Sequence, residues 1–238
     1  MRTNSLPIYR SGGRVATITG LTSPSSNDKT GDMLQLKILA DEGLDPIQAM
    51  KQGTDTKVCG DCPLRSVASG GSGGCYVVTA HAPLAVYRST VDMPVTPWEA
   101  IETPARFVKR EKIPPIRLGE YGDPAFLPLD LLERLTDGRG HTGYTHQWRS
   151  VSEGYSEYLM ASVETESQAR VANAMGYRHF RVLPDHGAPL MENEVLCPYY
   201  STDGKTQCAD CGLCAGNRSK AKSVAVVAHG PLAPKESK

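Results

Sequence analysis

The cysteines of this 238-residue chain fall into two groups whose spacing suits metal chemistry. In the C-terminal group, Cys208, Cys211 and Cys214 form two overlapping C-x-x-C units, and Cys197 lies further upstream. Three thiolates from one short loop plus one remote cysteine are typical of ferredoxin-type clusters, whereas zinc sites usually take two ligands from each of two separate knuckles. The spacing predicts a 4Fe–4S cluster, with structural zinc and unmetallated thiols as alternatives.

The N-terminal group contains the other three cysteines, Cys59, Cys62 and Cys75. The Ser/Gly-rich loop 69–74 is too flexible to hold its shape alone, so we expect a metal to tie Cys75 to the C-x-x-C pair. A 4Fe–4S cluster on three thiolates leaves one iron open to a substrate or cofactor, much as catalytic zinc keeps an open position. If the metal is zinc, His81 is the candidate fourth ligand. Alternatively, Cys75 is a small buried hydrophobic residue.

Composition and charge limit the partners. With 26 acidic and 26 basic residues the net charge is zero, so nothing draws the whole chain to nucleic acid or to an anionic membrane. The basic run 218–222 lacks interleaved aromatic residues, which makes a nucleic-acid partner a weak prediction. No segment approaches the roughly 18 apolar residues of a membrane span, and no secretory signal is visible. We therefore expect a cytoplasmic protein with reduced thiols and no membrane partner.

Alternating strands and helices predict an α/β fold with a parallel sheet. About six or seven parallel strands favour a partial, open β/α barrel, and a doubly wound sheet is the main competitor. We expect one domain over 33–230 that includes the cysteine loops 59–75 and 197–214, with a strand and loop before it over 1–32 and a flexible tail over 231–238. The expected strands cover 14–19, 33–39, 115–118, 141–145, 159–163, 179–183 and 224–228, and the expected helices cover 45–53, 83–91, 97–103, 127–135, 153–158 and 167–175.

Several ionisable residues directly follow predicted strands, where ligands of parallel sheets gather. His146 is the most informative, because an aromatic residue and hydrogen-bonding side chains share its strand end, and it could act as a general acid or base. The turn after the strand at 115–118 equally well explains some of these residues, since it is rich in glycine and proline. The candidate catalytic residues are Glu120, Asp123, His146 and Glu164.

As a set, these motifs resemble a family of uncharacterised bacteriophage proteins, over about residues 27 to 230. The layout is also similar to radical S-adenosylmethionine (radical SAM) enzymes. That likeness implies a partial β/α barrel, a three-cysteine cluster, an auxiliary cluster near the C-terminus, and S-adenosylmethionine bound by Gly119 and Glu120. The cysteine spacing differs from the compact C-x-x-x-C-x-x-C of that superfamily. The matching segments are 27–31, 59–63, 75–76, 118–124, 142–148, 160–163 and 208–214.

Two hypotheses follow from the sequence and the resemblance, and they leave open whether the chain is an enzyme. In the first, it is a phage-encoded iron–sulfur protein of the host cytoplasm that resembles radical SAM enzymes and acts on a small-molecule ligand. In the second, it is a non-catalytic protein, stabilised by zinc or by iron–sulfur clusters, that binds a host protein or nucleic acid. Both sets of cysteines would then be structural, replacing a hydrophobic core in loops too polar to pack.

Overall fold

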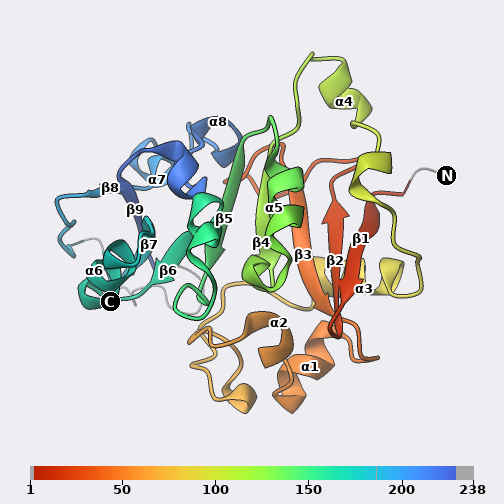
Figure 1. The fold of residues 1–238 in the computed structure, drawn as a ribbon, viewed down its shortest axis with the longest axis horizontal. Helices are drawn as coiled ribbons and strands as arrows, with labels where there is room; N and C mark the ends of the chain where they lie inside the picture. The colour runs from red at the N-terminus through yellow and green to blue at the C-terminus, as the bar shows by residue number, and fades with distance from the viewer. Residues whose placement is uncertain (1–2, 186, 229–238) are drawn as a thin grey trace.

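The computed structural model describes residues 3–185 and 187–228, and its centre is one nine-stranded sheet (Figure 1). The strand order is β1-β2-β3-β4-β5-β6-β7-β9-β8. The pairings β1–β2 and β2–β3 are antiparallel, and the pairings from β3 onward are parallel, as predicted for an α/β protein. The strands are β1 (Ser5–Ser11), β2 (Arg14–Thr19), β3 (Leu34–Ala40), β4 (Ile116–Tyr121), β5 (His141–Thr145), β6 (Met160–Val163), β7 (His179–Leu183), β8 (Glu194–Leu196) and β9 (Ser223–Val227).

The seven predicted strands are present, and two further strands, β1 and β8, were not predicted. β1 contains Pro7 and lies in a Ser/Gly-rich segment, which is a pattern that argues against a central strand; as an edge strand β1 tolerates the proline, and its register shifts between Pro7 and Tyr9. β8 is too short for a periodic signal. The segment 1–32 thus contributes a hairpin to the sheet, and the predicted tail 231–238 lies outside the described residues.

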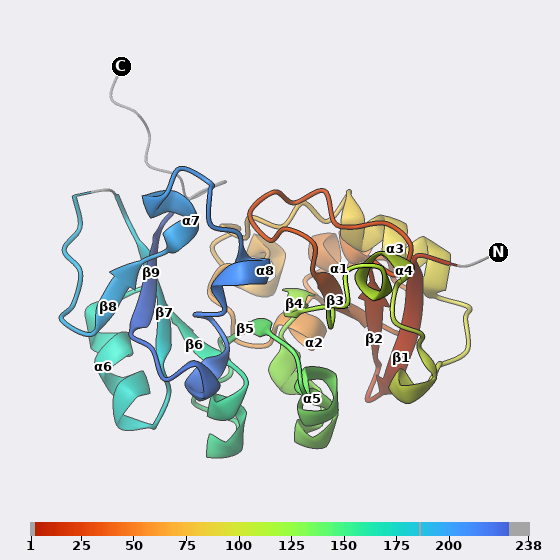
Figure 2. The ribbon, with the colours of Figure 1, turned by 90° about the horizontal axis from the view of Figure 1, so that it is seen from above.

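The helices are short and lie on both faces of the sheet. α5 and α6 lie on one face of the parallel strands, whereas α7 and α8 lie on the other (Figure 2). Their bounds are α1 (Pro46–Gln52), α2 (Thr56–Cys59), α3 (Ala82–Thr90), α4 (Ala105–Val108), α5 (Leu129–Thr136), α6 (Glu166–Ala174), α7 (Pro198–Ser201) and α8 (Cys208–Cys211).

Two predicted helices are wrong, because each is only a short 3₁₀ segment. The prediction over 97–103 reduces to Trp98–Ala100, since Pro104 disfavours helical backbone in the residue before it. The prediction over 153–158 reduces to Glu153–Glu157, which contains Gly154 and is too short to gain from α-helical propagation.

α1 begins at an N-cap, Asp45, and ends against the N-terminal cysteine loop. Asp45 accepts hydrogen bonds from the backbone N–H groups of Ile47 and Gln48, both at 2.9 Å, and the Gln48 side chain returns a bond to the Asp45 N–H at 3.0 Å. Gly53 ends the helix with φ 71°, and a Cβ there would lie 2.4 Å from the Ala68 carbonyl oxygen. Only glycine therefore allows the loop to pack this closely against α1.

β3 is buried on both faces, although its alternation of apolar and polar residues is typical of a strand with one buried face. Its apolar residues Leu36 and Ile38 belong to the main core, while Gln35 and Lys37, each 3% exposed, point to the other face. A buried lysine needs a partner of opposite charge, because removing an ammonium group from water is costly. That partner, Glu120, lines a cavity on this face of the sheet.

No helix among the described residues has both the length and the apolarity needed to cross a lipid bilayer.

Candidate functional site

A cavity of about 440 Å³ lies on the face of the sheet opposite α6. On β6, Ala161 and Val163 pack in one cluster with Ala169 of α6, whereas the intervening Ser162 lines the cavity. Successive side chains of a strand point to opposite faces, so one face of β6 packs against α6 and the other borders the cavity. The other strand residues that line the cavity are Arg117, Gly119, Glu120, Tyr121, Thr142, Tyr144, Phe180, Val182 and Val226.

A bulge at the end of β4 places the Gly119–Glu120 pair in this cavity. Gln35 of β3 is in register with Arg117, but Lys37 is in register with Tyr121, so β4 has two extra residues here. Gly119 adopts φ 67°, and a Cβ on it would lie 2.6 Å from Pro124. A bulge with a glycine at positive φ redirects the neighbouring side chains, and here the bulge brings Glu120 to the cavity wall.

Glu120 forms a buried ion pair with Lys37, at 3.1 Å between Oε2 and Nζ. Burial lowers the pKa of Lys37, and Glu120 acts against this shift. Sequence reasoning missed Lys37, although a lysine in an apolar strand that leads into a cysteine loop was a usable signal. Removing the Glu120 carboxylate leaves the buried Lys37 ammonium without compensation, which typically costs about 3–5 kcal/mol.

The N-terminal cysteine set is held by hydrogen bonds within its own loop. The carboxylate of Asp55, 4% exposed, accepts from the Ser66 N–H at 3.0 Å and from the Ser66 hydroxyl at 2.9 Å. The Cys75 N–H donates to the Leu64 carbonyl at 2.8 Å. These bonds order the loop without a metal, which its Ser/Gly-rich sequence did not indicate. Cys59, Cys62 and Cys75 all line the cavity.

The three thiols of this set interact electrostatically. Burial raises the pKa of Cys59, and the nearby thiols of Cys62 and Cys75 raise it further. Burial also raises the pKa of Cys75. Neutral thiols are therefore favoured at Cys59 and Cys75. A bound cation or metal would be needed to compensate their thiolates, and thiolates are the form that binds metal.

His146 connects this cysteine set to Glu164. Its Nε2 lies 3.0 Å from Glu164 Oε1, and its ring also hydrogen-bonds the Cys62 thiol. Burial lowers the pKa of His146, but the hydrogen bonds to Cys62 and Glu164 outweigh this and raise it to about 10. His146 lines the cavity, and Glu164 supports it from behind. The sequence predicted His146, Glu164 and Cys62 as candidate site residues, but not the hydrogen bond between the histidine and this thiol.

Asp123 lies in the cavity wall as a positioned carboxylate. It is 7% exposed, and it accepts from the backbone N–H groups of Ala125 at 3.0 Å and His146 at 2.9 Å. Burial raises its pKa, and these donors together with the Thr145 hydroxyl oppose the rise. Asp123 thus fixes the backbone at His146, so its clearest role is to orient that histidine.

The C-terminal cysteine set is embedded more deeply. Cys197 and Cys214 are buried among Met160, Val224 and Val226, and only Cys208 of this set lines the cavity. Burial raises the pKa of Cys214 to about 12, against a hydrogen bond with Tyr144 that lowers it. The thiols of Cys197, Cys208 and Cys211 raise it further, so the four thiols lie within electrostatic range of one another.

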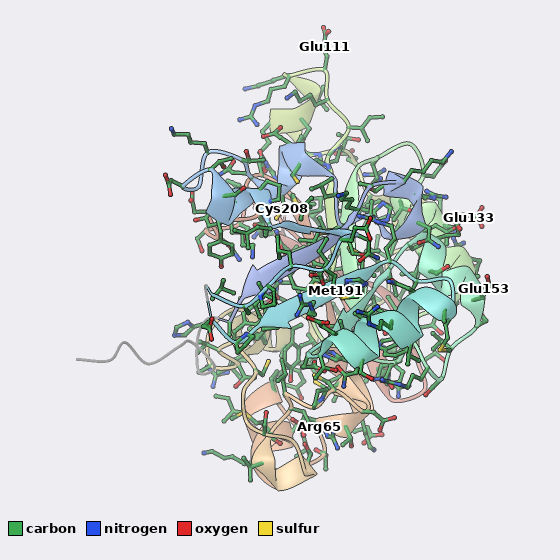
Figure 3. The ribbon with its side chains drawn as sticks, turned by 90° about the vertical axis from the view of Figure 1, so that its left-hand side faces the viewer. Arg65, Glu111, Glu133, Glu153, Met191 and Cys208 are labelled. Carbon is green, nitrogen blue, oxygen red and sulfur yellow. The ribbon has the colours of Figure 1, made fainter. Side chains whose placement is uncertain are left out.

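The loop 27–31, between β2 and β3, contacts the C-terminal cysteine set through hydrogen bonds. The backbone N–H of Cys208 donates to the Lys29 carbonyl at 2.9 Å, and that of Ala209 donates to the Thr30 carbonyl at 3.0 Å. Tyr199 donates its hydroxyl to the Asp28 carboxylate at 3.0 Å. In Figure 3, Cys208 lies between the projecting segment tipped by Glu111 and the loop that carries Arg65.

The donor chemistry of both sets fits a metal cofactor. All seven cysteines are free thiols, and soft thiolates are the ligands that iron–sulfur clusters and zinc share. Among the described residues, no three His, Cys, Asp or Glu side chains are arranged to hold a single metal ion. The residues fit a cofactor by number, type and electrostatic proximity, and Cys59, Cys62, Cys75, Cys197, Cys208, Cys211 and Cys214 would hold it.

Two other sequence candidates lie elsewhere. His81 is exposed at the start of α3 and is not part of the cavity lining. In the basic run 218–222, the Arg218 guanidinium lies over the Tyr158 ring, 4.6 Å from its centroid, and Lys222 donates to the Glu192 carbonyl at 3.0 Å. Both cations are exposed, and each has a partner within the chain.

The fold and the site define a class: an α/β protein with a mostly parallel sheet and a thiol-lined cavity on one face. The chain matches no family model, no curated protein and no solved structure. What it does must therefore be argued from its own residues.

Proposed function

We propose that the chain is an iron–sulfur protein with two clusters, one on each cysteine set, and that the cluster on Cys59, Cys62 and Cys75 has an open iron facing the cavity. The observation that carries the proposal is that both cysteine sets and the Glu120 bulge contribute to one cavity. Residues more than 140 positions apart converge there, as Cys59 and Cys208 show. Such convergence is expected of a site, and it is not needed to stabilise loops.

The order of elements supports a likeness to radical SAM enzymes on a partial, open β/α barrel. The N-terminal cysteine loop follows β3, the first strand with a parallel partner, and the Gly119–Glu120 bulge ends β4, the second. In that superfamily the cluster loop follows the first barrel strand, and a Gly-Glu pair binds the methionine amino group of the cofactor. The longer spacing to Cys75 is a departure, and the fold brings this thiol back to the other two.

When bound, such a cluster would supply an iron at which S-adenosylmethionine is cleaved reductively to a radical. This chain's residues would bind and orient the reactants. Glu120 offers a carboxylate oxygen in the cavity wall for an ammonium group, although Lys37 now occupies one side of it. His146 donates a hydrogen bond to the Cys62 sulfur, and Glu164 holds the imidazole in that orientation.

The test is electron paramagnetic resonance of the anaerobically purified, reduced protein before and after S-adenosylmethionine is added. We expect the cofactor to perturb the signal of one cluster, with the other unchanged, and Glu120→Gln to weaken the perturbation. Asp130→Asn, an exposed carboxylate on α5, is the matched control and should leave it intact. A spectrum that the cofactor does not change would refute the enzyme proposal while leaving the clusters in place.

The second proposal is a non-catalytic, metal-stabilised protein that binds a host protein or nucleic acid. It is favoured by the burial of Cys197 and Cys214 in a hydrophobic cluster, which is the position of a structural staple. Zinc could serve it if the thiols drew together to bond lengths of about 2.3 Å. Purified protein containing zinc and no sulfide would support this proposal over the first.

A further inference from the structure

Arg117 is a buried cation in the cavity wall that forms no ion pair with any described residue. It is 8% exposed, and among the described residues its side chain makes one hydrogen bond, from Nη2 to the Tyr76 hydroxyl at 2.6 Å. No carboxylate of those residues lies within ion-pair distance of the guanidinium. The nearby carboxylate of Glu120 is paired with Lys37. A guanidinium has five N–H donors, so most of its hydrogen-bonding capacity is available to the cavity.

Arg181 is the buried arginine with which Arg117 can be compared. It is 5% exposed on β7, and Glu194 accepts from its Nε at 2.7 Å and from its Nη2 at 2.6 Å. Bidentate pairing with a carboxylate is the usual way to compensate a buried guanidinium. Arg117 has comparable burial, and no described residue gives it such a partner, which indicates a place for an anionic ligand.

The surroundings of Arg117 indicate which kind of ligand could pair with it. Burial lowers the pKa of Arg117, but Tyr76 and Glu120 more than offset this, so the group stays charged. The rest of the cavity wall is largely apolar and aromatic, with Tyr144 and Phe180 packed at 4.3 Å between ring centroids and Val182 and Val226 beyond them. A volume of about 440 Å³ is in the range of small-molecule sites.

We propose that this cavity binds an organic anion, with a carboxylate or phosphate group on Arg117 and an apolar body against Tyr144 and Phe180. The inference names the ligand class for the cavity of the proposed function, and it rests on that cavity but not on its metal. A planar guanidinium matches an oxyanion through two parallel hydrogen bonds, which gives orientation as well as affinity.

Arg117 has one competing role. Its charge lowers the pKa of Cys208, as does that of Lys29, so both cations could instead balance thiolates of the C-terminal set. The two roles differ in what Arg117→Gln changes. In the anion role the variant loses ligand preference, whereas in the competing role it changes the properties of the C-terminal cluster.

The experiment compares two probes that differ only in charge, 3-phenylpropionate and 3-phenylpropionamide, by titration calorimetry on the full chain. We expect the acid to bind wild-type protein about tenfold or more tightly than the amide, because a charge-assisted pair is lost in the amide. Arg117→Gln should abolish the preference and Arg117→Lys should retain part of it. Arg139→Gln is the control, since Arg139 is half-buried beside Trp98 outside this cavity, and it should keep the preference.

Each result supports or overturns the inference. Displacement of the acid by inorganic phosphate would assign a phosphate-bearing ligand, and no displacement would assign a carboxylate. Equal binding of acid and amide, no binding of either, or a preference that survives Arg117→Gln would overturn it. Iron is measured in the same preparations. Iron-replete protein that shows no preference for the acid would count against the anion site and not against the clusters. Iron-free protein that still prefers the acid would count against the clusters and not against the anion site.

Discussion

The two cysteine sets have the same donor atom but opposite surroundings. Cys59, Cys62 and Cys75 are all half-buried, lie in a hydrogen-bonded loop and face the cavity. In the C-terminal set, Cys197 and Cys214 are buried in a cluster with Met160 and Val224. A ligand set at a cavity wall can give a substrate access to metal, whereas a set inside the core joins strands and loops. We therefore propose a role in chemistry for the first set and a role in stability for the second.

The largest expected effect is that of Cys214→Ser. It would remove one ligand of the embedded set and place a hydroxyl in an apolar cluster, because Cys214 is 8% exposed. Since metal binding energy is also folding energy, we expect a loss of about 3 kcal/mol or more and a sharply lower yield of folded protein. Thermal unfolding and soluble yield are the measurements. An unchanged melting temperature would remove the distinction between the sets.

Cys75→Ser should instead separate metal content from folding. The loop around it is also held by Asp55 and Ser66, so the fold should survive while about half of the iron is lost. Iron analysis and circular dichroism would show this. Ser72→Ala, in the same loop, is the control and should retain all of the iron. Collapse of the fold in Cys75→Ser would make the first set structural as well.

We expect acid to destabilise the sheet through His141, which belongs to neither cysteine set. His141 is 3% exposed at the start of β5 and bonds the Tyr158 carbonyl at 3.2 Å; burial lowers its pKa to about 4. Between about pH 6.5 and 4 the unfolded chain takes up a proton that the folded protein does not, so stability falls as pH falls, by at most about 3 kcal/mol. Above that window both states are neutral.

Denaturant unfolding across this pH range is the measurement. His141→Gln keeps a donor for Tyr158 without titrating near these pH values, so its curve should be flatter. His81→Gln changes an exposed histidine and should leave the curve unchanged. A residual slope is expected from the buried pair of His179 and Glu194, whose pKa values are both lowered. A wild-type curve that is flat from pH 7 to 4 would contradict the assignment.

The smallest predicted effect is that of Tyr144→Phe. The phenol hydrogen-bonds Cys214, and its ring packs on Phe180, a contact that the variant keeps. We expect a loss of about 1 kcal/mol in stability. Hydrogen bonds to cluster sulfurs raise reduction potentials, so the C-terminal cluster should also become harder to reduce. Redox titration followed by electron paramagnetic resonance would show one potential lowered and the other unchanged; a shift in the N-terminal cluster alone would reverse the assignment.

The sequence predicted the class of fold because hydrophobic periodicity and helix caps are local signals. Asp45, with Pro46 after it, specified α1, and the apolar run 224–228 specified β9. Periodicity could not show that β9 inserts between β7 and β8, because strand order depends on pairings between distant segments.

The site was predicted in part for the same reason. Spacing identified the cysteines, and strand ends suggested Glu120 and His146. Lys37 and Arg117 were missed because their role depends on which face of the strand borders a cavity, and that is a property of the assembled sheet. Their signal was a cation between apolar neighbours, with Lys37 between Leu36 and Ile38 and Arg117 between Ile116 and Leu118.

The measurement that tests the central claim most directly is the content of iron, acid-labile sulfide and zinc in anaerobically purified wild-type protein. Two 4Fe–4S clusters predict about eight irons and about eight sulfides per chain, with little zinc. Zinc bound in stoichiometric amounts without sulfide, or metal-free protein that is fully folded, would contradict the account.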